Sequence, residues 1–176
     1  SWTGYHLKDH VLNSMTKALE FKNINEVFDN FKGAGGGAYG QCYADDSGNI
    51  GWIAMTQYPK RKDEVAGHTG IKEGWSGKYE WEGFVTPDKI PSMINPKNGY
   101  VFSANNKVSS CNVEAGIGAT QPSTARAIRL NYLLNDLLHV KKQKVDANDM
   151  KKILNDTHDV FAAMKTLLII SVVEKK

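Results

Sequence analysis

An asparagine and an arginine 21 positions apart, Asn105 and Arg126, are the residue types best suited to chemistry. Asn105 follows the short apolar run Tyr100–Phe102, and Arg126 stands near the start of an expected helix. If that helix packs beside the end of the run, an amide N–H and a guanidinium would meet where they could stabilise a developing oxyanion. The alternatives are a simple turn at Asn105 and Asn106 and a helix-to-loop ion pair of Arg126, and spacing alone favours these.

Other residues that invite a chemical interpretation fit their expected sites poorly. The glycine tract Gly33–Gly40 is not followed by Gly-Lys-Ser/Thr and leads into a strand, so it does not fit a phosphate loop. His6 and His10 lack a third metal ligand. Asp45–Asn49 has its glycine in the wrong place for a calcium loop and reads as a turn. Ser1 could act as an N-terminal nucleophile only at the start of a strand, and the chain there is expected to enter a helix.

The composition is that of an ordinary folded domain, with 176 residues, 41% hydrophobic and 23% charged. The net charge of +3 and the dispersed basic residues predict no nucleic-acid partner. The apolar stretch Phe161–Val173 contains Lys165 and is shorter than the roughly 20 residues that a membrane span needs. We therefore expect no membrane span, and a helix face buried in the protein.

Hydrophobic periodicity predicts a mixture of helices and strands, the α+β class. Asn23 is a plausible N-cap for a short helix at Ile24–Phe31. One hairpin and one further strand make a poor independent sheet, so the chain is expected to be part of something larger. The predicted elements within 1–176 are helices in 8–32, a β-hairpin in 41–57, an aromatic loop in 58–98, a strand at 99–104 and helices in 124–173 at Thr124–Val140 and Asp146–Val173.

Two weaker signals remain open. Cys42 and Cys111 could form one bridge or remain two thiols. The triplet Asn155-Asp156-Thr157 fits the glycosylation pattern, but it falls inside a predicted helix.

Four ordered motifs carry a more specific signal. The hairpin reads YADDSGNIGWI (43–53), and it is followed by YPKR (58–61), GKYEWEGF (77–84) and NPKNGYVFSANN (95–106). In order and gaps these motifs resemble the penicillin acylase (penicillin amidase) family of N-terminal-nucleophile hydrolases. The opening SWTGY and the segment VDANDMKKILND (145–156) also resemble family segments, so the likeness spans nearly the whole chain.

The resemblance implies a four-layer αββα sandwich and amide hydrolysis through an acyl-enzyme. The nucleophile would be a serine whose own α-amine acts as the base. Asn105 stands at the position of the family's oxyanion asparagine, and Arg126 at that of the arginine that orients it, which makes them the candidate catalytic residues. Tyr39 falls where the family lines its acyl pocket. Calcium is possible by resemblance, with no ligand assigned, and the family favours a secreted, periplasmic or lumenal location.

The chain also departs from the family pattern. The nucleophile segment is missing, because SWTGY corresponds to an interior stretch of the family's β chain. We therefore expect one part of an amidohydrolase, incomplete and inactive without the segments that carry the nucleophilic serine, and acting on a small acyl amide. The alternative is a non-catalytic structural subunit that keeps the acylase scaffold.

Overall fold

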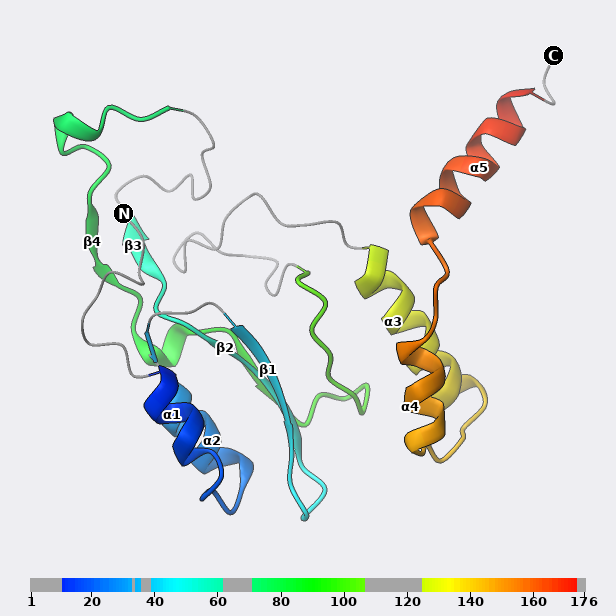
Figure 1. The fold of residues 1–176 in the computed structure, drawn as a ribbon, viewed down its shortest axis with the longest axis horizontal. Coiled ribbons are helices and arrows are strands. Elements are labelled where there is room, and N and C mark those ends of the chain that lie inside the picture. Colours follow the sequence, from blue (N-terminus) through cyan, green and yellow to red (C-terminus); the bar gives the residue numbers. More distant parts are fainter. Residues whose placement is uncertain (1–10, 33, 36–38, 62–70, 107–124, 174–176) are drawn as a thin grey trace. The chain divides into compact units, whose positions relative to one another are not determined.

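The computed structural model describes residues 11–32, 34–35, 39–61, 71–106 and 125–173 (Figure 1). Its elements are mixed helix and sheet, which confirms the α+β class. The chain divides into two compact units: unit 1 comprises residues 1–103 and 107–121, and unit 2 comprises residues 104–106 and 122–176.

Unit 1 contains a three-stranded antiparallel sheet. β1 (Tyr39–Ala44) and β2 (Ile50–Met55) form the predicted hairpin, with Tyr39 opposite Met55 and Ala44 opposite Ile50. β5 (Ser92–Ile94) pairs with the other edge of β2, so the strand order is β1-β2-β5. A separate two-stranded ribbon joins β3 (Pro59–Arg61) to β4 (Trp81–Phe84).

The central strand β2 is buried on both faces of the sheet. Ile53 and Met55 belong to a cluster on the helical side, whereas Trp52 and Ala54 pack with Ile90 on the other side. This alternation follows from the two-residue period of side chains along a strand. The sheet is therefore the middle layer of unit 1.

Two helices precede the sheet, α1 (Val11–Lys17) and α2 (Ile24–Phe31). α2 begins where the sequence predicts, because the Asn23 side chain accepts hydrogen bonds from the backbone N–H groups of Asn25 and Glu26. Its buried face packs against β2. α1 ends at Lys17, and residues 8–10 of the predicted helical stretch lie outside the described residues.

Asn95 fastens the hairpin turn to β5. Its backbone N–H donates to Ile50 O, its Oδ1 accepts from Ile50 N at 3.0 Å, and its Nδ2 donates to Asn49 Oδ1 at 2.8 Å. Asn49 Nδ2 in turn donates to both carboxylate oxygens of Asp45. Two of the family-like motifs, at 43–53 and 95–106, therefore meet in one hydrogen-bond network.

The predictions for residues 58–104 need correction. The stretch 58–98 holds three short strands and the 3-10 turns Gly74–Ser76 and Pro87–Lys89, so it is not a structureless loop. The strand predicted at 99–104 is absent, since this run pairs with no strand of either described sheet. Val101 instead packs on the Trp52 face of the sheet, and a Cβ added at Gly40 would lie 2.7 Å from Ser103 Oγ. The run is apolar because it covers a sheet face.

Unit 2 is helical in its described part. α3 (Ala125–Asn135) continues into a π-helical turn, η4 (Asp136–Val140). α4 (Ala147–Leu154) starts with a capping box formed by Asp146 and Asp149. α5 (Val160–Val173) is a separate helix. The helix predicted from Asp146 to Val173 is therefore wrong in one respect, since it breaks at 155–159, where Asp159 Oδ1 accepts a hydrogen bond from Ala162 N and starts a new helix.

The apolar helix α5 lacks the predicted burial. Within the part of the chain that the structure describes, none of its residues is buried. Leu167, Leu168 and Ile169 are 68%, 66% and 63% exposed. Its apolar residues run around the whole helix, so α5 has no distinct polar face. No described helix is both long and apolar enough to cross a bilayer.

Candidate active site

Asn105 stands in a tight turn of unit 2, in a left-handed backbone conformation with φ of 56°. Asparagine tolerates this conformation better than most residues with a side chain. The preceding Ala104 is 2% exposed, and its N–H donates to Asn106 Oδ1 at 3.2 Å. Asn106 thus supports the turn, while the Asn105 side chain is exposed.

Arg126 is the second residue of the described part of α3, and its side chain binds the turn at residues 104–106. Its Nη2 donates to Asn105 Oδ1 at 2.6 Å and to the Ala104 carbonyl at 3.1 Å. A guanidinium carries several donors in a fixed plane, so it can bind neighbouring acceptors at once. The residues that the sequence places 21 positions apart are therefore in direct contact.

This contact fixes the orientation of the Asn105 amide. Arginine can only donate, so the atom facing it must be the amide oxygen, and the two donors on Nδ2 face elsewhere. Among the described residues, none accepts a hydrogen bond from Nδ2. Because the positive guanidinium also polarises the amide, Nδ2 is a stronger donor to any oxygen that develops negative charge beside it.

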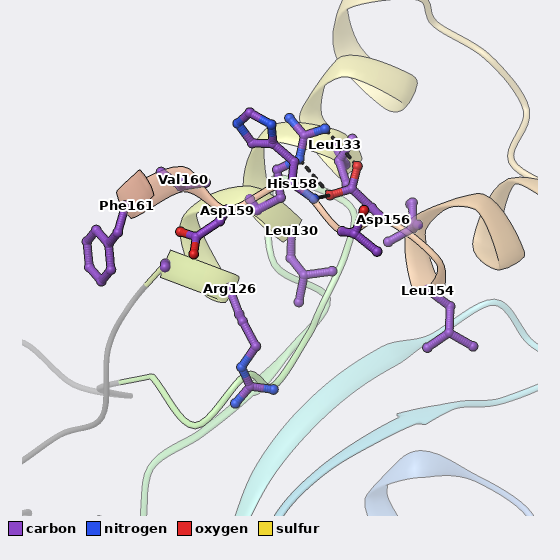
Figure 2. Close-up of a pocket in the computed structure, with 13 residues that line it drawn as sticks. Arg126, Leu130, Leu133, Leu154, Asp156, His158, Asp159, Val160 and Phe161 are labelled. Carbon is purple, nitrogen blue, oxygen red and sulfur yellow. Dashed lines mark hydrogen bonds and ion pairs between the residues drawn. The ribbon is translucent and has the colours of Figure 1, made fainter. Parts of the chain in front are cut away.

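A cavity of about 510 Å³ lies along α3 in unit 2. Its wall includes Arg126, Leu130 and Leu133 from α3, and Leu154 and Phe161 from α4 and α5 (Figure 2). Most of these side chains are apolar.

One ion pair joins α3 to the segment between α4 and α5. Arg129 Nε donates to Asp156 Oδ1 at 2.9 Å, and Arg129 Nη2 donates to Asp156 Oδ2 at 2.7 Å. The hydrogen bonds from Arg129 hold the pKa of the Asp156 carboxyl below its ordinary value, and the same contact raises the pKa of the guanidinium. Both groups stay charged over the neutral range, which preserves the bidentate geometry.

The remaining sequence candidates are placed as follows. Tyr39 begins β1 in unit 1 and is 51% exposed. Cys42 is a free, exposed cysteine. Ser1, His6, His10 and Cys111 lie outside the described residues. Among the residues described, no group of three histidine, cysteine, aspartate or glutamate side chains could hold a metal ion.

Sequence reasoning missed the pair of Arg129 and Asp156. The two residues are 27 positions apart, and no local pattern links them. One signal could have drawn attention to Arg129. It lies three residues after Arg126 on the same helix, where side chains at this spacing are neighbours.

The chain is similar in sequence to known acylases. The sequence profile of the family described as penicillin amidase matches residues 1–174. An acyl-homoserine lactone acylase QuiP of Pseudomonas putida is 26% identical over 154 residues, which cover 84% of this chain and 17% of that protein. The penicillin acylase 2 proenzyme of a Pseudomonas species is 29% identical over 94 residues, 53% of this chain and 12% of the relative.

A solved structure shares the fold. The thermostable penicillin G acylase from Alcaligenes faecalis superposes with a TM-score of 0.58 at 23% identity, over 81% of this chain and 24% of that one. The chain thus spans less than a fifth of the two curated relatives' length and about a quarter of the solved chain. Since the profile match runs over nearly all of its residues, the chain belongs to the penicillin amidase family.

Proposed function

We propose that this chain is part of an amidohydrolase that cleaves a linear or cyclic amide through an acyl-enzyme. Asn105 Nδ2 donates to the oxyanion of the tetrahedral intermediate, and Arg126 holds Asn105 Oδ1. An N-terminal serine on another segment or chain is the nucleophile. The observation that carries the proposal is the 2.6 Å hydrogen bond from Arg126 to Asn105 Oδ1, which leaves the amide donors facing outward.

The chemistry follows from preorganisation. An oxyanion hole works when its donors are already aimed at the place where charge develops, so that nothing must reorient during the reaction. The left-handed backbone of Asn105 sets where its side chain begins, and the hydrogen bond from Arg126 sets how the amide is turned.

The substrate class comes from the family and its relatives. The matching proteins are named as acylases of homoserine lactones and of penicillins. Both names support a small acyl amide as substrate. In this proposal Tyr39 lines the pocket for the acyl group.

The same proposal places these elements in a four-layer αββα sandwich completed by further protein. β2 is buried on both faces, as expected for a sheet inside a layered fold. The exposed apolar surface of α5 supports the idea that further protein segments cover it. Large exposed apolar surfaces usually mark interfaces.

The test uses the assembled enzyme, with the serine-bearing segment present and a panel of chromogenic acyl anilides as substrates. Asn105→Ala and Asn105→Gly are both made, since glycine keeps the left-handed backbone and alanine does not. We expect kcat to fall by about 10²–10³-fold in both, the loss typical of one oxyanion donor. Asn25→Ala, at an exposed position of α2, is the matched control and should keep full activity.

Full activity in Asn105→Gly would reject the oxyanion role. If the assembled protein with unaltered Asn105 cleaves none of the amides and no serine α-amine lies beside residue 105, the structural-subunit alternative replaces the proposal.

A further inference from the structure

The contact between Arg126 and Asn105 depends on where α3 lies. Arg126 is the second residue of the described part of α3 (Ala125–Asn135). A second contact that fixes α3 nearby would therefore help to keep Arg126 against Asn105.

Arg129 provides such an attachment one turn later. Its guanidinium binds both oxygens of Asp156 and lies 5.4 Å from the centre of the Tyr132 ring. The ion pair is partly shielded from water, with side-chain exposures of 26% and 20%. Two parallel hydrogen bonds and a ring contact restrict the guanidinium far more than a single surface ion pair would.

Asp156 is itself held by the backbone around it. Its Oδ1 accepts from His158 N at 3.2 Å, and its own N–H donates to Ile153 O at the end of α4. Figure 2 shows Asp156 beside His158, with dashed contacts at the Asp156 carboxylate. A continuous chain of contacts thus runs from α4 through Asp156 and Arg129 to α3.

The cavity beside α3 makes this connection more important. A cavity of about 510 Å³ lies between parts of α3 and residues 153–161, so fewer side chains pack against the helix there. The bidentate ion pair of Arg129 and Asp156 links the two walls of this cavity. We expect its removal to loosen α3 at this point.

We infer that Arg129 and Asp156 are positioning residues. They hold α3 in place so that Arg126 stays hydrogen-bonded to Asn105 Oδ1. The inference rests on the proposed function, because the contact it protects is the one assigned to the oxyanion donor. It adds two residues that touch neither the substrate nor Asn105.

The test compares Arg129→Lys, Arg129→Gln and Asp156→Asn in the assembled enzyme. Since small displacements of positioning groups can be costly, we expect kcat to fall about tenfold in Arg129→Gln, with KM within about twofold. In an Asn105→Ala background the same change should reduce kcat by less than about twofold, because residues that act through one another are not additive. Lysine keeps the positive charge but cannot make the two parallel hydrogen bonds of a guanidinium. The kcat of Arg129→Lys should therefore fall nearly as much as that of Arg129→Gln.

The matched control is the ion pair of Lys141 and Asp136 in the same unit, which joins Nζ and Oδ2 at 2.6 Å. Lys141→Gln should leave kcat unchanged. A second measurement needs no turnover: with ¹⁵N-labelled asparagine, the side-chain amide signal of Asn105 should shift in Arg129→Lys and not in Lys141→Gln.

An unchanged Asn105 signal, an unchanged kcat in Arg129→Gln, or an equal loss in the Asn105→Ala background would each overturn the inference. If Asn105→Ala loses activity while Arg129→Gln does not, only this inference fails. If Asn105→Ala keeps full activity, the proposed function fails with it.

Discussion

Two asparagines of this chain share an unusual backbone conformation and differ in what their side chains do. Asn95 has φ of 48° and Asn105 has φ of 56°. Asn95 uses both ends of its amide inside the hairpin network, since its oxygen accepts from Ile50 and its nitrogen donates to Asn49. Both the oxygen and the nitrogen of this amide therefore hold the fold.

Asn105 is occupied at one end only. Its oxygen accepts from Arg126, whereas none of the described residues accepts a hydrogen bond from its nitrogen. The contrast teaches that a strained backbone does not by itself identify a functional residue. The informative feature is which donors and acceptors remain available once the fold is formed.

The largest effect that sharpens this comparison is expected from Arg126→Gln. A glutamine amide can present a donor or an acceptor, so the Asn105 amide would no longer be locked with its nitrogen outward. We expect kcat of the assembled enzyme to fall about 10- to 100-fold, somewhat less than the loss of the donor itself. Steady-state kinetics on the acyl anilide panel measure it. A variant with unaltered kcat would show that Arg126 does not support the amide.

Asn95→Gly should show the opposite pattern. Glycine keeps the left-handed backbone and removes two side-chain hydrogen bonds, so we expect the free energy of unfolding to fall by about 1–2 kcal/mol. The kcat of the folded enzyme should remain within about twofold. Denaturation in urea measures the first and kinetics the second. Asp46→Ala, an exposed change in the same hairpin turn, is the control and should alter neither.

A smaller effect is expected in the pH dependence of stability, through Asp45, which Asn49 connects to Asn95. Hydrogen bonds from the side chain and backbone of Asn49 hold the pKa of Asp45 below its ordinary value. A lowered pKa in the folded state means that Asp45 stabilises the fold above the ordinary carboxyl pKa of about 3.9, and that this contribution is lost as the pH falls further.

Asp45→Asn should therefore unfold more easily than the native chain at pH 7, with the difference shrinking below about pH 4. Unfolding curves recorded from pH 7 to pH 3 test this sign. Asp46→Asn removes the same charge from the same turn and should follow the native curve. A difference that grows as the pH falls would contradict the account of Asp45.

Local signals predicted the local structure well. The Asn23 cap, the helix after it and the hairpin around Asp45 each depend on residues within a few positions, and all three are present. The motif resemblance also pointed to Asn105 and Arg126, which spacing alone could not do.

Most of the failures involve information that local sequence does not carry. β5 has three residues, too few to show an alternation, and it forms by pairing with the distant strand β2. The break at 155–159 is different, because the Asp159 cap that starts α5 is a local signal between two apolar stretches at helical spacing. The ion pair of Arg129 and Asp156 needs two distant elements to be folded before it can form.

The apolar surface of α5 has a consequence for the making of this protein. A helix with leucine, isoleucine and valine on every side is a site for self-association until other chain covers it. If the proposed covering segments were produced separately, self-association of α5 would compete with their binding. Synthesis in one polypeptide would reduce that competition, since the covering surface would be tethered close by.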